Sequence, residues 1–167
     1  MEGGNMERKQ KIINMFFNST ITYLDVLIGE KRIATKLSEE NYNFNSKGVT
    51  VIIGIAEGGK GRMILDMSKE TALKLTSKIT GENYIKMEKF VLETLAEIGN
   101  MLTGHGITTV NNRNQGLNLR LTPPSIFSGK NLTINVPKVS ITGININTVI
   151  GEFSIHIGFE KLGDGEK

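Results

Sequence analysis

The 167-residue chain is 38% apolar and 22% charged, a composition typical of an ordinary globular protein, and it is long enough to form one domain with its own core. It has no cysteine, which excludes disulfides and thiolate metal sites. Its net charge of +3 comes from lysines and arginines scattered along the chain, without the basic patch and interleaved aromatic residues of nucleic-acid-binding proteins, so we expect no nucleic-acid partner.

The N-terminal stretch MEGGNMERKQ is polar and lacks the apolar segment of a secretory signal. The longest apolar runs, such as VTVIIGIA, are too short to cross a bilayer. We therefore expect a cytoplasmic protein without a membrane partner. It should fold as a single domain over residues 1–167, with flexible termini at about 1–8 and 163–167.

Apolar residues spaced three and four apart predict an amphipathic helix over residues 7–29, which Gly29 ends. Its expected apolar side is formed by Ile13, Phe16, Phe17, Ile21, Leu24, Val26 and Leu27. A polar stretch rich in Asn and Lys follows to about Lys47, and no element is predicted there.

Residues 48–68 predict two strands joined by a tight turn, because the β-branched run VTVIIGI is followed by the glycines of EGGKG. A glycine-rich loop can also bind phosphate, but this one lacks the Gly-Lys-Ser/Thr ending before a helix. Ser68 is a candidate cap for a second helix, with Glu70 in its first turn and Gly81 at its end. The apolar side of that helix should contain Ala72, Leu73, Leu75 and Ile79.

A third helix is predicted for FVLETLAEIGNMLTGHG, residues 90–106, and should end at its glycines. At about 100° per residue, one face collects the apolar residues Met87, Val91, Leu95, Ile98 and Leu102. The opposite face collects Glu93, Glu97, Asn100 and Gly104, and Phe90 and Met101 flank it.

Glu97 and Asn100 are three residues apart, so their side chains are neighbours on this face. An amide cannot act as a general base near neutral pH, but it can hold a water molecule in line with an electrophile, while a carboxylate can bind a cation on a partner. Gly99 and Gly104 would let a partner approach closely. The alternatives remain that the pair is ordinary helix surface and that Phe90 and Met101 belong to the margin of the core.

Four later segments rich in Ile, Val and Thr predict strands, namely LNLRL, NLTINV, VSITGININ and GEFSIHIGFE, with Pro123-Pro124 separating the first two. Together these elements predict an α+β fold, in which three helices pack on a mainly antiparallel β-sheet.

The segment ETLAEIGNMLTGHG resembles the signature helix of the CheC/CheX/FliY phosphatases of bacterial chemotaxis, and its Glu97-Ile98-Gly99-Asn100 matches their Glu-x-x-Asn motif. IINMFFNSTITYL, VIIGIAEGGKGRMILDMSKETALKL and LRLTPPSIFSGKNL resemble further CheX segments in the same order. The motif occurs once, and strand patterns follow TPPSIFSGKN where a second long helix would stand, so the resemblance is to CheX and not to CheC. The segment that FliY needs for the flagellar switch is not found either.

The resemblance implies a CheC/CheX-like fold and the dephosphorylation of phosphorylated CheY, a response regulator that holds phosphate on an aspartate. Asn100 would orient the attacking water, and Glu97 would engage the regulator's active-site lysine. The regulator would bind Mg²⁺, and this chain would have no cofactor or metal site of its own.

Phe90, Glu93, Met101 and Gly104 are candidate partner-binding residues beside this motif. His105 and His156 lie outside it, and we expect them at a helix end or on a strand surface. The resemblance also implies a homodimer through sheet edges, for which we expect the C-terminal strand region to be used. The alternative function is a non-catalytic CheX-like module that binds or sequesters a response regulator.

Overall fold

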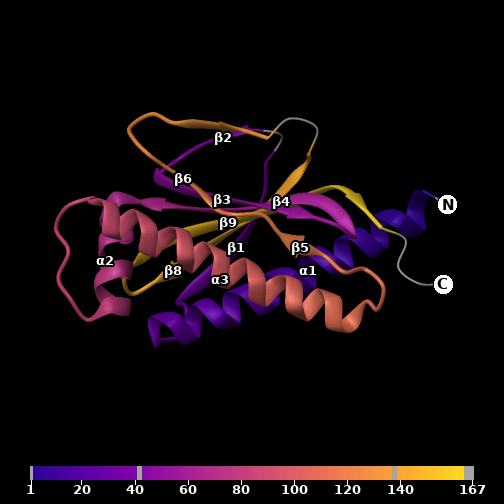
Figure 1. Cartoon of the computed structure of the whole chain (residues 1–167), viewed down its shortest axis with the longest axis horizontal. Helices are drawn as coiled ribbons and strands as arrows, with labels where there is room; N and C mark the ends of the chain where they lie inside the picture. The colour runs from indigo at the N-terminus through magenta and orange to yellow at the C-terminus, as the bar shows by residue number, and fades with distance from the viewer. Residues whose placement is uncertain (1, 41–42, 137–138, 164–167) are drawn as a thin grey trace.

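The computed structural model describes residues 2–40, 43–136 and 139–163. In chain order its elements are α1 (Glu2–Ile28), β1 (Ala34–Glu40), β2 (Asn43–Asn45), β3 (Gly48–Ala56), β4 (Gly59–Ser68), α2 (Lys69–Thr80), α3 (Lys89–Arg113), β5 (Arg120–Leu121), β6 (Ser125–Ser128), β7 (Thr133–Asn135), β8 (Ile141–Thr148) and β9 (Gly151–Leu162). Figure 1 shows the helices against one face of a sheet, and β2 on the opposite face.

The main sheet has the strand order β1-β8-β9-β4-β3-β5, and β6 also pairs with β3. All of these pairings are antiparallel. The α+β prediction is therefore confirmed, as is the hairpin of β3 and β4. Glu57 and Gly58 at its tip have φ angles of 51° and 58°, which are the left-handed values that a two-residue hairpin turn requires.

The helices pack on the sheet through the apolar stripes that their periodicity predicts, with some exceptions. Ser68 caps α2 by accepting a hydrogen bond from the Thr71 backbone N–H at 3.1 Å, and Gly81 ends it in a left-handed conformation. Val26 is 68% exposed and Ile79 is 37% exposed, so both predictions of a buried side chain are wrong. Val26 lies about 200° around the helix from the buried Leu24 and so points to solvent.

The predicted end of α3 at its glycines is also wrong, because the helix continues to Arg113. Gly106 is buried where α3 crosses α1. A Cβ atom on Gly106 would lie only 2.4 Å from the ring of Phe16, so the glycine permits a close helix crossing.

The N-terminal residues 2–8, which were expected to be flexible, belong to helix α1. Arg8 in this stretch donates a hydrogen bond to the carbonyl of Gly163 at 2.9 Å.

Three strands have no counterpart in the sequence prediction, namely β1 and β2 in the polar stretch before Lys47, and β6 after Pro123-Pro124. Among the described residues, β1 pairs with β8 alone, at one edge of the sheet. Its sequence ATKLSEE is polar, as the sequences of edge strands commonly are. These strands are defined by distant partners, which local periodicity does not reveal.

The C-terminal strands are interior strands. β8 lies between β1 and β9, and β9 lies between β8 and β4. The expectation that this region supplies the edge for a homodimer is therefore wrong. In the described part of the main sheet, the outer strands are β1 on one side and β5 with β6 on the other.

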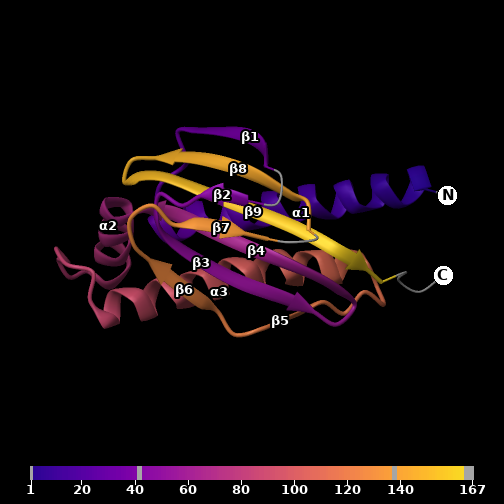
Figure 2. The ribbon, with the colours of Figure 1, turned by 90° about the horizontal axis from the view of Figure 1, so that it is seen from above.

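A second apolar cluster fills the face of the sheet opposite the helices, beneath the ribbon of β2 and β7 (Figure 2). Its buried members are Ile64, Ile134, Val136, Val139 and Ile141. His156 is only 1% exposed on this face, and its ring stacks on that of Phe44 with centroids 4.5 Å apart. The expectation of a strand-surface position for His156 is thus wrong. Burial, with a smaller contribution from Lys47, lowers the pKa of His156 to about 4.

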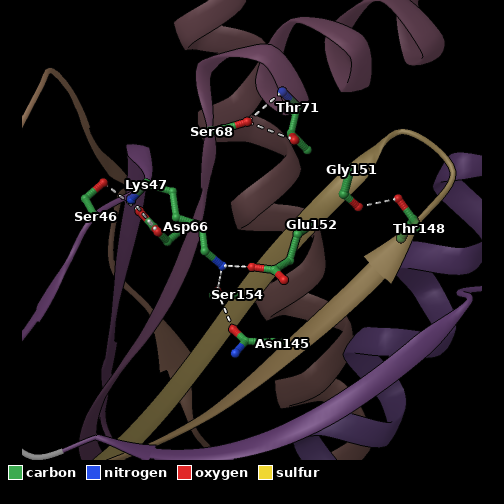
Figure 3. A network of polar contacts seen from close by, with 10 residues as sticks. All are labelled: Ser46, Lys47, Asp66, Ser68, Thr71, Asn145, Thr148, Gly151, Glu152 and Ser154. Atoms are coloured by element: carbon green, nitrogen blue, oxygen red, sulfur yellow. Dashed lines mark hydrogen bonds and ion pairs between the residues drawn. The ribbon is translucent and has the colours of Figure 1, made fainter.

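A polar network joins the chain between β2 and β3 to this face, as Figure 3 shows. The buried Asp66 carboxylate accepts hydrogen bonds from the Ser46 hydroxyl at 2.7 Å, the Lys47 backbone N–H at 2.9 Å and the Thr50 hydroxyl at 2.7 Å. The Lys47 ammonium forms an ion pair with Glu152 at 2.5 Å. Because the three donors satisfy a carboxylate that is only 1% exposed, these bonds fix where β3 enters the sheet.

His156 should make the fold sensitive to acid. Between pH 6.5 and about 4 the unfolded chain binds a proton at this histidine that the folded chain does not bind. Stability is therefore lost as pH falls through this range, by at most about 3 kcal/mol from this group. Urea unfolding at pH 7 and pH 4.5 measures the loss.

The matched control is His156→Phe, which keeps a ring on Phe44 but cannot titrate. The parent should lose more stability than this variant between the two pH values. Equal losses would show that protonation of His156 does not contribute.

Candidate active site

Helix α3 presents Glu97 and Asn100 on the side that faces away from the core. Val91, Leu95 and Leu102 on the other side are fully buried, and Ile98 is 2% exposed. Glu97 is exposed and Asn100 is half-buried. The predicted division of the helix is therefore confirmed, and burial of the apolar stripe forces the acid and the amide outward side by side.

Phe90 lies on the same side of α3, near its N-terminus, and half of its surface is exposed. Its ring stacks on Tyr84 with centroids 5.7 Å apart, so it rests on the connection between α2 and α3. Tyr84 is held in turn by a hydrogen bond from its backbone N–H to the Ser77 hydroxyl at 2.9 Å. The sequence prediction included Phe90 but not Tyr84, since nothing in the helical pattern reaches that connection.

The other candidate partner-binding residues also lie on this side. Glu93 is exposed and forms an ion pair with Lys89 at 3.5 Å, within the first turns of α3. Met101 and Gly104 are half-buried. A Cβ atom on Gly104 would meet only the Leu121 side chain, at an ordinary 3.8 Å, so space remains around this glycine.

Gly99 does not face a partner, contrary to the sequence prediction. It is buried and faces β3, where a Cβ atom would lie 2.7 Å from Cγ1 of Val51. The glycine therefore admits the sheet and not a partner. Its neighbour in the motif, Asn100, is turned by about 100° along the helix and reaches the half-buried margin.

The segment from Leu119 to Pro124 runs beside α3, on the flank that carries Asn100. The Asn111 side chain accepts a hydrogen bond from the Leu119 N–H and donates one to its carbonyl, both at 2.9 Å. Thr122 fastens the same segment to β3, because its hydroxyl accepts from the Gly54 N–H at 3.0 Å and its own N–H donates to the Gly54 carbonyl at 2.9 Å. The segment thus forms a fixed wall beside the helix.

His105 lies within α3 and not at a helix end, because the helix extends beyond the predicted boundary. Its ring is exposed and stacks on Tyr23 of α1 with centroids 3.7 Å apart. Within the described ranges, no group of three or more His, Cys, Asp or Glu side chains could hold a metal ion. No helix in the described part of the chain is long and apolar enough to cross a membrane.

The family model for the chemotaxis phosphatase CheX matches residues 49–154, which include α2, α3, the Glu-x-x-Asn motif and the wall beside it. The chain belongs to the CheX family. The resemblance found in the sequence is therefore confirmed.

Individual relatives agree with this assignment. The CheY-P phosphatase CheX of Thermotoga maritima is 27% identical over 145 residues, which cover 86% of this chain and 89% of the relative. A chemotaxis protein CheX from Desulfovibrio desulfuricans superimposes with a TM-score of 0.77 at 20% identity, covering 89% of this chain and 99% of that one. CheX in a CheX–CheY–BeF₃–Mg²⁺ complex from Borrelia burgdorferi superimposes with a TM-score of 0.76 at 27% identity, covering 88% and 96%.

Proposed function

We propose that this chain hydrolyses the aspartyl phosphate of a CheY-type response regulator in chemotaxis, with Asn100 and Glu97 as the catalytic residues. One observation carries the residue assignment. In a CheX-family chain, Glu97 and Asn100 are neighbours on the outer side of α3, where their side chains do not contribute to the core. The Thermotoga maritima relative, which is named a CheY-P phosphatase, supports the reaction.

In this reaction a water oxygen attacks phosphorus while the bond from phosphorus to the aspartate oxygen breaks. The products are inorganic phosphate and the free carboxylate of the regulator. Asn100 holds the water in line through its amide oxygen, which accepts a hydrogen bond from the water and leaves a lone pair on the water oxygen free to attack. Positioning of this kind supplies much of the catalysis in phosphoryl transfer, because the transition state makes few covalent demands on the protein.

Glu97 fixes the docking geometry. Its exposed carboxylate forms a charge-assisted hydrogen bond with the regulator's active-site lysine, so that Asn100 meets the phosphorylated aspartate. The regulator holds Mg²⁺, which neutralises developing charge on the phosphoryl oxygens. The Borrelia burgdorferi complex, which contains CheX, CheY, BeF₃ and Mg²⁺, supports a direct meeting of the two proteins with Mg²⁺ present.

Phe90, Glu93, Met101 and Gly104 form the rest of the regulator-binding surface. Phe90 contributes an exposed aromatic ring that Tyr84 holds in place, which suits a protein interface because little side-chain freedom is lost on binding. Gly104 adds no side chain to this surface, so the regulator can approach the helix backbone there. Because response regulators act inside the cell, this role places the protein in the cytoplasm.

Two copies of the chain pair through β1. Its seven residues, Ala34–Glu40, pair with β8 on one side and form one margin of the main sheet. An edge strand presents backbone N–H and C=O groups to which a second chain can bond. The opposite margin, formed by the shorter β5 and β6, offers fewer such groups in sequence.

Replacing Asn100 with alanine should lower turnover of the phosphorylated regulator by at least roughly 100-fold, because no other group holds the water. The free energy of unfolding should change by no more than about 0.5 kcal/mol, since the side chain is only half-buried and alanine favours a helix. Phosphate release measures turnover, and urea unfolding measures stability.

Asn112→Ala is the matched control, since Asn112 is an exposed asparagine on the same helix and outside the motif. It should turn over the regulator at the parent rate. Parent-like turnover by Asn100→Ala would refute the mechanism. If the parent chain itself binds the phosphorylated regulator without accelerating phosphate release, the chain is the non-catalytic binding module.

Replacing Glu97 with alanine should weaken binding of the beryllofluoride-loaded regulator about tenfold, because the ion pair with the regulator's lysine is lost. Calorimetry on both proteins and on a regulator with that lysine changed to alanine completes a double-mutant cycle. The two substitutions should cost less together than the sum of their separate costs.

Glu70→Ala controls for the change in net charge, because Glu70 is an exposed acid on α2. It should bind the regulator like the parent. Additive costs for Glu97→Ala and the lysine variant would remove Glu97 from contact with that lysine.

If two copies pair through β1, sedimentation equilibrium should give twice the mass of one chain at high concentration. On dilution, backbone amides of β1 should lose protection against hydrogen exchange, while those of β6 should not. A single-chain mass at every concentration, or a loss confined to β6, would contradict this arrangement.

A further inference from the structure

Gly99 is the point where α3 sits directly on the sheet. A Cβ atom at this position would lie 2.7 Å from Cγ1 of Val51 and 3.3 Å from Cδ1 of Ile53. Real side chains do not approach as closely as the first distance, so either the helix or the strand would have to move. The position inside the catalytic motif therefore has room for hydrogen only.

Val51 cannot easily give way. It is fully buried in β3, where it is paired with Leu65 of β4 on one side and with Ile126 of β6 on the other. Its β-branched side chain has few alternative rotamers in such packing. A methyl group at position 99 would consequently displace α3 outward, since the strand is held from both sides.

The distance between α3 and β3 also determines where Asn100 lies relative to the wall formed by Leu119–Pro124. Asn100, Gly104 and Asn111 are separated by four and seven residues, so they share one flank of the helix. Asn111 is hydrogen-bonded to Leu119, and Gly104 faces Leu121, which places this flank against the segment Leu119–Pro124. From Arg120 onward the segment is tied to β3, by the pairing of β5 with β3 and by the hydrogen bonds of Thr122 with Gly54, so this part stays with the sheet when the helix moves.

We propose that Gly99 is a positioning residue for hydrolysis. Its missing side chain sets the distance between α3 and β3, and this distance fixes the depth of the Asn100 amide beside the wall. The inference rests on the proposed function, in which Asn100 orients the attacking water. Glu97 is exposed on the outer side of α3, so capture of the regulator should depend less on this distance than turnover does.

The test is Gly99→Ala, assayed below its melting temperature with the phosphorylated regulator. The value of kcat should fall roughly tenfold, because small misplacements of a positioning group cost turnover steeply. KM and the affinity for the beryllofluoride-loaded regulator should stay within about twofold of the parent values. In the double variant Gly99→Ala/Val51→Ala, which removes the clashing methyl group, most of the lost kcat should return relative to Val51→Ala alone.

Gly106→Ala is the matched control. It also introduces a methyl group at a crowded buried glycine, 2.4 Å from the ring of Phe16, but the contact is with α1 and not with β3. It should lower the melting temperature while leaving kcat near the parent value. A similar fall in kcat for Gly106→Ala would show that general loosening of α3 is responsible, and would overturn the inference.

Val51→Ile provides a milder route to the same displacement if Gly99→Ala does not fold, because it enlarges the strand side of the contact. It should lower kcat with little change in KM. Parent-like kcat in the folded Gly99→Ala or Val51→Ile variants, or no recovery in the double variant, would overturn the inference. Asn100→Ala distinguishes failure of this inference from failure of the proposed function. If Asn100→Ala slows turnover but the Gly99 and Val51 variants do not, only the role of Gly99 fails. If Asn100→Ala also turns over the regulator at the parent rate, the proposed function fails.

Discussion

The close packing of α3 on β3 determines which side chains of the helix a partner can meet. Val91, Leu95, Ile98 and Leu102 are buried against the core, and this leaves Glu97 and Asn100 on the outside. Successive side chains of a helix are rotated by a fixed angle about its axis. Turning the helix to expose any other pair would therefore bury charge and expose the apolar stripe. The same packing brings the helix backbone onto Val51 at Gly99.

The two faces of the sheet have different tasks. The helical face carries the candidate catalytic residues and the wall formed by Leu119–Pro124. On the opposite face, the β2–β7 ribbon covers an apolar cluster, and the Asp66 network anchors the chain that leads into β3. Since β3 is the strand on which α3 sits, order on the ribbon side supports the geometry on the helical side.

Much of this architecture could be predicted from the sequence, where local periodicity coincides with burial. The outward pair Glu97/Asn100 followed from the helical period, and the β3–β4 hairpin followed from its glycines and β-branched residues. Prediction failed where a distant contact determines the outcome. Polar β1 is a strand because β8 lies beside it, and His156 is buried because the ribbon covers it. A glycine in a helix has the same sequence signal whether it ends the helix, admits a partner or admits a neighbouring element, so Gly99 and Gly106 were misinterpreted.

The central claim is that Asn100 and Glu97 meet the reacting centre of the regulator from the outer side of α3. A crystal structure of this chain with its regulator, loaded with beryllofluoride and Mg²⁺, tests it most directly. The account predicts the Asn100 amide at hydrogen-bonding distance from the beryllofluoride group or from a water in line with it, and the Glu97 carboxylate on the regulator's lysine. A regulator bound to another face, with Asn100 open to solvent, would contradict it.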